Sequence, residues 1–159
     1  MSRGIKDDLR VALGTAVRAF QRAVDALDEA VAAHLGINRT DLRCLDVLIE
    51  LETATPGLLA ERLGLTTGSV TAMLDRLERL GYLTRSPDPA DRRRVIVRPT
   101  ASAVAAAMDI YGPLAAAGDE VTARYTAADL RLVIDYLDRG RALQEEHAAR
   151  IRSLPRRPR

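Results

Sequence analysis

The spacing of apolar residues predicts a long first helix. Between Asp7 and Leu35 they recur every three or four positions, at Leu9, Leu13, Val17, Phe20, Val24, Leu27 and Val31. This period places them in one stripe along about eight helical turns, roughly 43 Å at 1.5 Å per residue. A small domain cannot cover so long a stripe by itself, so we expect part of it to contact a second subunit. Gly36 stands where glycine commonly ends a helix.

Two shorter helices are predicted next. A cap at Asn38 or Thr40 begins the first of them. Its apolar residues supply a core face, formed by Leu42, Leu45, Val47, Leu48, Ile49 and Leu51. The second begins at Pro56, a residue that the first turn of a helix tolerates, with Thr55 as its cap.

The segment that begins at Pro56 has the residue pattern of a helix-turn-helix. The fifth position from Pro56 is small, the ninth is glycine, and five further positions are apolar. In order these residues are Leu59, Ala60, Leu63, Gly64, Leu65, Val70 and Met73. Small Ala60 lets two helices cross closely, and Gly64 permits the sharp turn between them. The second helix of the pair is therefore expected over residues 67–80, with Gly81 ending it.

From Tyr82 the pattern changes from that of a helix to that of strands. Residues 82–85 and 94–98 are predicted strands, and the turn-rich segment 86–93 joins them. This combination predicts a β-hairpin with a long tip, immediately after the helix-turn-helix.

Two long helices are predicted in the last third of the chain. Thr100 caps an alanine-rich helix that continues to about residue 125, with a kink at Pro113. Thr126 and Asp129 approximate a capping box, which opens a last helix to about residue 153. The tail 154–159 is basic and broken by proline, and we expect it to be disordered. The predicted fold class is thus mainly α with a small β-hairpin.

Composition excludes several classes of function. With 47% hydrophobic and 29% charged residues, the chain is typical of a soluble globular protein. It has no apolar run near the roughly 20 residues of a membrane helix and no signal peptide, so we expect a cytoplasmic protein that contacts no membrane. One cysteine and two histidines argue against disulfides and metal centres, and no cofactor is expected. We find no spacing of nucleophile, base and orienting group, so the chain is not predicted to be an enzyme.

Charge is concentrated in the predicted hairpin. The net charge is only +2, yet residues 85–98 hold five arginines against two aspartates. Twenty-three of the 24 basic residues are arginine, with Lys6 the single lysine. The planar guanidinium suits bidentate contact with phosphate and guanine. A hairpin of this kind would lie beside duplex DNA, with an arginine reaching the minor groove.

The helix predicted over residues 67–80 divides into two faces. Its buried side is expected to comprise Val70, Met73, Leu74, Leu77 and Leu80. The opposite side is small and hydroxylic near its N-terminus and basic further along, as a helix entering the major groove N-terminus first requires. Together with the hairpin tip, it gives the candidate DNA-binding residues Thr67, Gly68, Ser69, Thr71, Ala72, Arg76, Arg79, Arg92, Arg93 and Arg94. Asp91 is expected to orient a neighbouring arginine by a charge-assisted hydrogen bond.

Three stretches, 59–65, 70–83 and 88–95, resemble the MarR family of bacterial winged-helix transcription regulators. The most specific signature is the Asp-x-Arg of the wing, supplied here by Asp91 and Arg93. The resemblance implies a homodimer that binds a palindromic operator in double-stranded DNA, acts as a repressor and is released by a small-molecule effector. It divides the chain into a helical dimerisation region, 1–35 and 101–153, and a winged helix-turn-helix DNA-binding region, 36–100.

Under this resemblance the long terminal helices form the dimer interface. Apolar residues of the last helix are expected to pack against the first helix of the partner. The candidate interface residues are Leu9, Leu13, Val17, Leu130, Val133, Ile134, Leu137 and Ile151. Gly68 and Ala72 stand where relatives often carry longer side chains, so we expect few direct base contacts and more dependence on DNA shape.

Two alternatives stay open at this point. Cys44 would make the protein a redox-sensing regulator if its thiol were reactive, although a lone cysteine is more often a small core residue. A winged helix can also serve protein–protein contact without affinity for DNA. The five arginines between residues 85 and 98 argue against this second alternative, because a protein-binding wing has no need of them.

Overall fold

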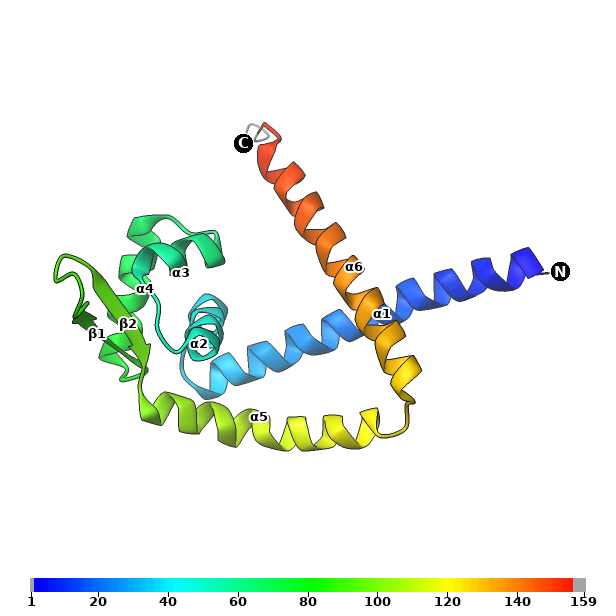
Figure 1. The fold of residues 1–159 in the computed structure, drawn as a ribbon, viewed down its shortest axis with the longest axis horizontal. Coiled ribbons are helices and arrows are strands. Elements are labelled where there is room, and N and C mark those ends of the chain that lie inside the picture. Colours follow the sequence, from blue (N-terminus) through cyan, green and yellow to red (C-terminus); the bar gives the residue numbers. More distant parts are fainter. Residues whose placement is uncertain (1, 156–159) are drawn as a thin grey trace. The chain divides into compact units, whose positions relative to one another are not determined.

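The computed structural model describes residues 2–155, and its elements follow the predicted order. They are α1 (Ser2–His34), α2 (Arg39–Leu51), α3 (Pro56–Leu63), α4 (Thr67–Arg79), β1 (Leu83–Pro87), β2 (Val95–Pro99), α5 (Ala101–Thr122) and α6 (Ala127–Ser153). The predicted fold class, mainly helical with one β-hairpin, is confirmed. Figure 1 shows α2, α3, α4 and the hairpin gathered at the C-terminal end of α1.

The chain forms two compact units, one up to Ile110 and the other from Tyr111 onward. The boundary falls inside α5, so the first unit holds α1 to α4, the hairpin and the start of α5. The second unit holds the rest of α5, which continues through Pro113, and α6, none of whose residues is buried. Across residues 2–155 no helix combines the length and the apolar character that crossing a membrane demands.

Local capping signals set the helix boundaries. Of the two candidate caps for α2, Asn38 is the one used: its side chain accepts the N–H of Asp41 at 2.9 Å, and the Asp41 carboxylate accepts the Asn38 N–H at 3.3 Å. Thr55 caps α3 by accepting the Leu58 N–H at 3.3 Å. Gly64 ends α3 at φ 65°, in the left-handed region that favours glycine. These contacts explain why the predicted turn positions are confirmed.

The last helix begins at the predicted capping box. Thr126 accepts the N–H of Asp129 at 3.2 Å, and the Asp129 carboxylate accepts the Thr126 N–H at 2.9 Å. The Thr126 hydroxyl also donates to Asp129 Oδ2 at 2.7 Å, and this bond, with a smaller contribution from the Thr126 N–H, holds the pKa of Asp129 below its ordinary value. After α6 come Leu154 and Pro155; the rest of the predicted tail, 156–159, lies outside the described residues.

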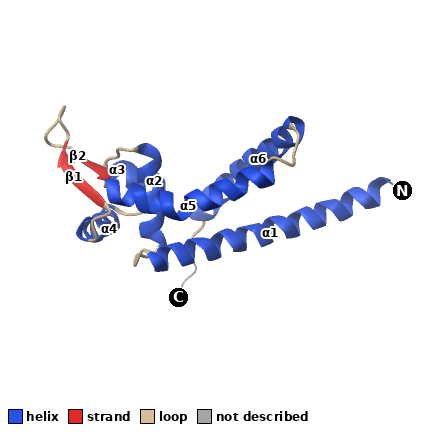
Figure 2. Cartoon of the chain, turned by 90° about the horizontal axis from the view of Figure 1, so that it is seen from below, coloured by secondary structure: helices blue, strands red, loops and turns tan. Residues whose placement is uncertain are grey.

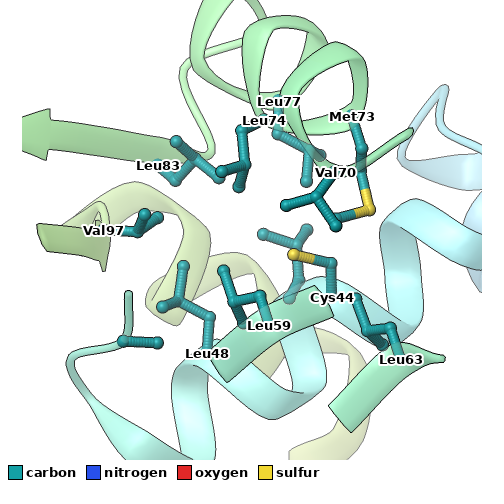
Figure 3. Packing of buried hydrophobic residues seen from close by; sticks show 12 residues of the cluster. Cys44, Leu48, Leu59, Leu63, Val70, Met73, Leu74, Leu77, Leu83 and Val97 are labelled. Carbon is teal, nitrogen blue, oxygen red and sulfur yellow. The ribbon is translucent and has the colours of Figure 1, made fainter. Parts of the chain in front are cut away.

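One apolar core joins the helix-turn-helix to the hairpin (Figure 3). Its buried members come from α2, α3, α4, both strands and the loop before α3: Cys44, Leu45, Leu48, Ala54, Leu59, Leu63, Val70, Met73, Leu74, Leu77, Leu83 and Val97. Each fully buried leucine of this kind contributes about 1.5–3 kcal/mol relative to an exposed one. The core therefore fixes the outward surface of α4 relative to the base of the hairpin.

One predicted core residue is not in the core. Val70, Met73, Leu74 and Leu77 are at most 2% exposed, as expected, but Leu80 is 50% exposed. The helix ends at Arg79, and Leu80 is its C-cap. Gly81, at φ 79°, then turns the chain toward β1. Leu80 still has helical backbone angles and donates its N–H to the Arg76 carbonyl at 3.1 Å, but it is the last residue before that turn and does not pack in the core.

The hairpin is antiparallel and is extended by a third short segment. Leu83 pairs with Pro99 at its base and Pro87 with Val95 at its outer end. Beside β2, the loop residue Ala54 donates its N–H to Val97 O at 3.0 Å and accepts the Val97 N–H at 2.8 Å. In Figure 2 the loop that joins β1 to β2 points away from α2, α3 and α4. The tip is therefore presented to the surroundings, while the base is bonded to the core.

Candidate nucleic-acid interface

The N-terminal turn of α4 is exposed and carries hydroxyl groups. Thr66 caps the helix by accepting the N–H of Ser69 at 3.3 Å, and the two hydroxyls lie 2.9 Å apart. The Thr71 hydroxyl donates to the Thr67 carbonyl at 3.0 Å, which leaves its oxygen available as an acceptor. The first N–H groups of a helix lack intrahelical partners and attract anions. The predicted residues Thr67, Gly68, Ser69, Thr71 and Ala72 are all exposed here.

The next turn of α4 differs from the prediction at Arg76. This side chain was expected to face outward and bind DNA. Its Nε instead donates to Asp41 Oδ2 at 2.8 Å, and its Nη2 to Asp41 Oδ1 at 2.5 Å. The hydrogen bonds to Asp41 raise the pKa of Arg76 further above its ordinary value. Asp41 is fully buried on α2, so the ion pair joins α4 to the start of α2.

Four other predicted arginines are exposed, and within residues 2–155 their side chains form no hydrogen bond or ion pair. They are Arg79 of α4 and Arg92, Arg93 and Arg94 of the hairpin tip. An exposed guanidinium without an internal partner keeps its full charge and all its donors for an external anion. The structure thus places a small, hydroxylic helix end, one helix arginine and three tip arginines in the same compact unit.

Asp91 organises the tip in a different way from the one we expected. In the described part of the chain its carboxylate forms no ion pair with an arginine side chain. It accepts the backbone N–H of Arg93 at 3.0 Å, while its carbonyl accepts the N–H of Arg94 at 2.8 Å. At the start of the tip, Asp88 accepts the N–H of Ala90 at 2.9 Å. Short aspartate side chains commonly fold turns this way, so Asp91 shapes the loop and leaves the guanidinium groups unbound.

One arginine of the hairpin is neutralised by α4. Arg85 of β1 binds the Glu78 carboxylate through its Nε at 2.9 Å and its Nη2 at 2.5 Å, and its Nη2 lies 2.7 Å from Asp75 Oδ1. These contacts hold the pKa of Glu78 below its ordinary value, and the hydrogen bond from the Arg85 side chain is the largest cause. The charge that the hairpin offers externally therefore comes from its tip and from Arg98, not from Arg85.

Of the residues that hold α4, Asp41, Glu78 and Arg85 were not among the predicted site residues. Asp41 carried one usable signal, an acidic residue three positions after the cap Asn38. That signal predicts the capping box but not the bond to Arg76, which lies 35 positions away. Glu78 and Arg85 offered no local signal, because their pairing requires that β1 fold back along α4.

Comparison with known proteins identifies the family. The model described as MarR family matches residues 35–94, from the end of α1 to the hairpin tip. The HTH-type transcriptional regulator YcgE of Bacillus subtilis (strain 168) is 36% identical over 141 residues, which cover 87% of this chain and 92% of that protein. The chain belongs to the MarR family. It is a MarR-type transcriptional regulator, and the predicted resemblance is confirmed.

Solved structures place the fold in the same family. MarR from E. coli in its apo form has a TM-score of 0.58 and 26% identity, covering 80% of this chain and 94% of that one. A mutant of that protein, complexed with operator DNA, has a TM-score of 0.56 and 25% identity, covering 81% and 93%. α3 and α4 are therefore the helix-turn-helix of a MarR-type winged helix, α4 is its recognition helix, and the β1–β2 hairpin is its wing.

The apolar residues predicted to form the MarR-type dimer interface lie outside the core. Leu9, Leu13, Val133, Ile134, Leu137 and Ile151 are exposed, from 45% for Leu13 to 65% for Leu9. Val17 and Leu130 are half-buried. Large apolar surfaces are uncommon on monomeric soluble proteins, and they commonly mark protein contacts. The assignment of these residues to a dimer interface stays a prediction.

Cys44 lies in the core of this MarR-family regulator and is fully buried. Burial, with a smaller contribution from the Asp41 charge, raises the pKa of its thiol from 9.0 to about 12. A reactive cysteine needs an accessible thiolate. The packing role is therefore favoured over the redox-sensing alternative.

Proposed function

We propose that this regulator binds double-stranded DNA as a homodimer. Each subunit inserts the N-terminal end of α4 into a major groove and lays its wing tip along the adjacent minor groove. One observation carries the proposal: Arg79, Arg92, Arg93 and Arg94 are exposed and, in the described part of the chain, have no internal partner. The E. coli relative whose structure contains operator DNA supports it.

The dimer is proposed to form through the regions 1–35 and 101–153, with 36–100 binding DNA. Two winged helices double the number of phosphate contacts and favour a palindromic site. The exposed apolar residues of α1 and α6 support this arrangement, because a partner helix would remove them from water.

A salt titration tests the proposed mode of binding. Duplexes that bind the wild-type protein would first be selected from a random DNA library. Fluorescence anisotropy would then measure the binding of the full chain to these duplexes. If three arginines per subunit contact phosphates, a dimer makes six such contacts, and the slope of log K against log salt concentration is about −5. Binding that does not change with salt, or no binding to any duplex, would overturn the proposal.

The regulatory direction that we propose is repression, relieved by a small ligand. The dimer would occlude a promoter that overlaps its operator, and a phenolic or anionic compound would lower its affinity for DNA. A reporter gene driven by the selected operator should be less active with the protein than without it. Salicylate is a suitable first probe, and it should raise the Kd measured by anisotropy. A reporter that the protein activates would reverse the direction.

A further inference from the structure

The bond between Arg76 and Asp41 uses the directional donors of the guanidinium. Nε and Nη2 point to the two oxygens of one carboxylate, at 2.8 and 2.5 Å. Asp41 is 0% exposed, and its Oδ2 also accepts the Asn38 N–H that closes the cap of α2. A buried carboxylate of this kind depends on its partner, because a buried charge without one is strongly destabilising.

The segment that holds Asp41, residues 35–41, is itself anchored; we call it the α1–α2 corner. At one end the Tyr82 hydroxyl, from the segment between α4 and β1, donates to the Leu35 carbonyl at 2.7 Å. At the other end Arg39 binds Asp25 and Asp28 of α1, at 2.8 and 3.1 Å. Arg76 therefore attaches α4 to a point already bonded to α1 and to the base of the wing.

We propose that Asp41 and Arg76 are positioning residues, which fix the angle of the recognition helix on the α1–α2 corner, and that Arg76 does not itself contact DNA. This inference rests on the proposed function, since it concerns how α4 is presented to a duplex. A guanidinium that turned toward a phosphate would lose two charge-assisted bonds and leave Asp41 buried without its counter-charge. Exposed Arg79, one turn later, is free to make the external contact.

Removing the Asp41 charge separates positioning from contact. In Asp41→Asn the amide oxygen still accepts the Asn38 N–H, so the cap of α2 is retained, while the negative charge and the acceptor for Arg76 Nη2 are lost. If Arg76 positions α4, this variant binds the selected duplex about tenfold more weakly, with an unchanged salt slope. If Arg76 contacts phosphate, the substitution frees it, and affinity is equal to or higher than that of the wild type, which would overturn the inference.

Arg76→Gln and the double variant Asp41→Asn/Arg76→Gln complete a thermodynamic cycle. If Arg76 only positions α4, the double variant should bind DNA no more weakly than the single variant with the lower affinity, because both substitutions break the same Arg76–Asp41 interaction. A phosphate contact by Arg76 predicts instead that Arg76→Gln lowers the magnitude of the salt slope by about 2 per dimer. The double variant also replaces the charged pair by two neutral amides and leaves no unpaired buried charge, so it is the variant to measure if Arg76→Gln alone does not fold.

Two controls keep the outcomes distinct. Arg43→Gln removes an exposed arginine of α2 outside the candidate interface and should leave affinity unchanged. Circular dichroism at the assay temperature shows whether each variant is folded, and titration with excess DNA gives the fraction of the protein that can bind. If the Asp41–Arg76 pair only stabilises the fold, the folded fraction of each variant binds DNA as tightly as the wild type. That result would also overturn the inference. If the wild type binds no duplex, the proposed function fails; if it binds and Asp41→Asn binds equally tightly, only this inference fails.

Discussion

Arg85 of the wing and Glu78 of the recognition helix are joined by three hydrogen bonds, all received by the one carboxylate. The Arg85 backbone N–H donates to Oε1 at 3.0 Å, and its Nε and Nη2 donate to Oε2 at 2.9 and 2.5 Å. The backbone bond fixes the start of β1, and the side-chain bonds fix the guanidinium. The wing is thereby tied to the same helix that we expect to read DNA.

This relationship predicts a pH-dependent contribution to stability. The pKa of Glu78 is lowered in the folded protein. The stabilisation that its carboxylate gains from Arg85 is therefore complete above the ordinary glutamate pKa of 4.5 and is lost as the pH falls through the lower pKa of the folded state. Glu78→Gln should therefore lower the urea midpoint at pH 7 and have little effect at a pH where the wild-type carboxyl is protonated. The control Glu61→Gln alters an exposed residue of α3 and should change neither midpoint. An equal difference at both pH values would contradict the assignment.

The wing tip supplies the second prediction. Arg93→Ala removes an exposed guanidinium, while the backbone N–H of residue 93 still donates to Asp91, so the tip keeps its shape. Affinity for the selected duplex should fall by about 1–3 kcal/mol, with helix content and the dimer unchanged. Anisotropy and light scattering measure the two properties. The exposed residue Arg124, between α5 and α6, is the matched control as Arg124→Ala. Equal affinity for Arg93→Ala and wild type would remove the wing from the account.

The dimer interface supplies the third prediction. Leu137 is 57% exposed in the single chain and lies on the proposed interface face of α6. Leu137→Asp would bury an unpaired carboxylate in the dimer. The dimer should therefore dissociate at a higher protein concentration than the wild type and lose affinity for DNA in parallel. Analytical ultracentrifugation measures the dissociation. Leu132, on the opposite side of the same helix, is 69% exposed, and Leu132→Asp should leave the dimer intact. A Leu137→Asp protein that stays dimeric would show that this face is misassigned.

The fourth prediction concerns Cys44. Because burial raises the pKa of the Cys44 thiol to about 12, almost none of it is ionised at pH 8. The folded protein should react with a thiol reagent such as DTNB only as slowly as it unfolds, and the denatured protein should react at once. Brief treatment with hydrogen peroxide should leave DNA affinity unchanged. Rapid labelling of the folded protein would restore the redox-sensing alternative.

The sequence predicted what local chemistry determines. Pro56, Thr55 and Gly64 each act within a few residues, so the boundaries of α3 were predictable from their positions alone. The wing was predictable in the same way, from the change of period after Gly81 and the charge of its tip. The boundaries of α3 and the wing each depend on residues that are close in the sequence and also close in space.

Long-range polar pairs were not predictable. Asp41 and Arg76 are 35 positions apart, and a helical wheel that considers α4 alone places Arg76 on the outward side. Leu80 was misplaced for a related reason, since the wheel gives the direction of a side chain but not whether another element covers it. The exposed arginines of the candidate site were predicted from their positions, whereas the residues that hold α4 in place required the folded chain.

Hydroxyl-radical footprinting on the DNA that flanks the protein's own gene is the decisive test of binding by a dimer. Two copies of α4 and of the wing tip, related by a dyad, should protect two backbone segments whose centres lie about one helical turn apart, roughly 34 Å. Arg93→Ala should weaken the protection of both segments equally. A single unsymmetrical footprint, or no protection at low salt, would contradict the proposal that a dimer of this chain binds DNA through α4 and the wing.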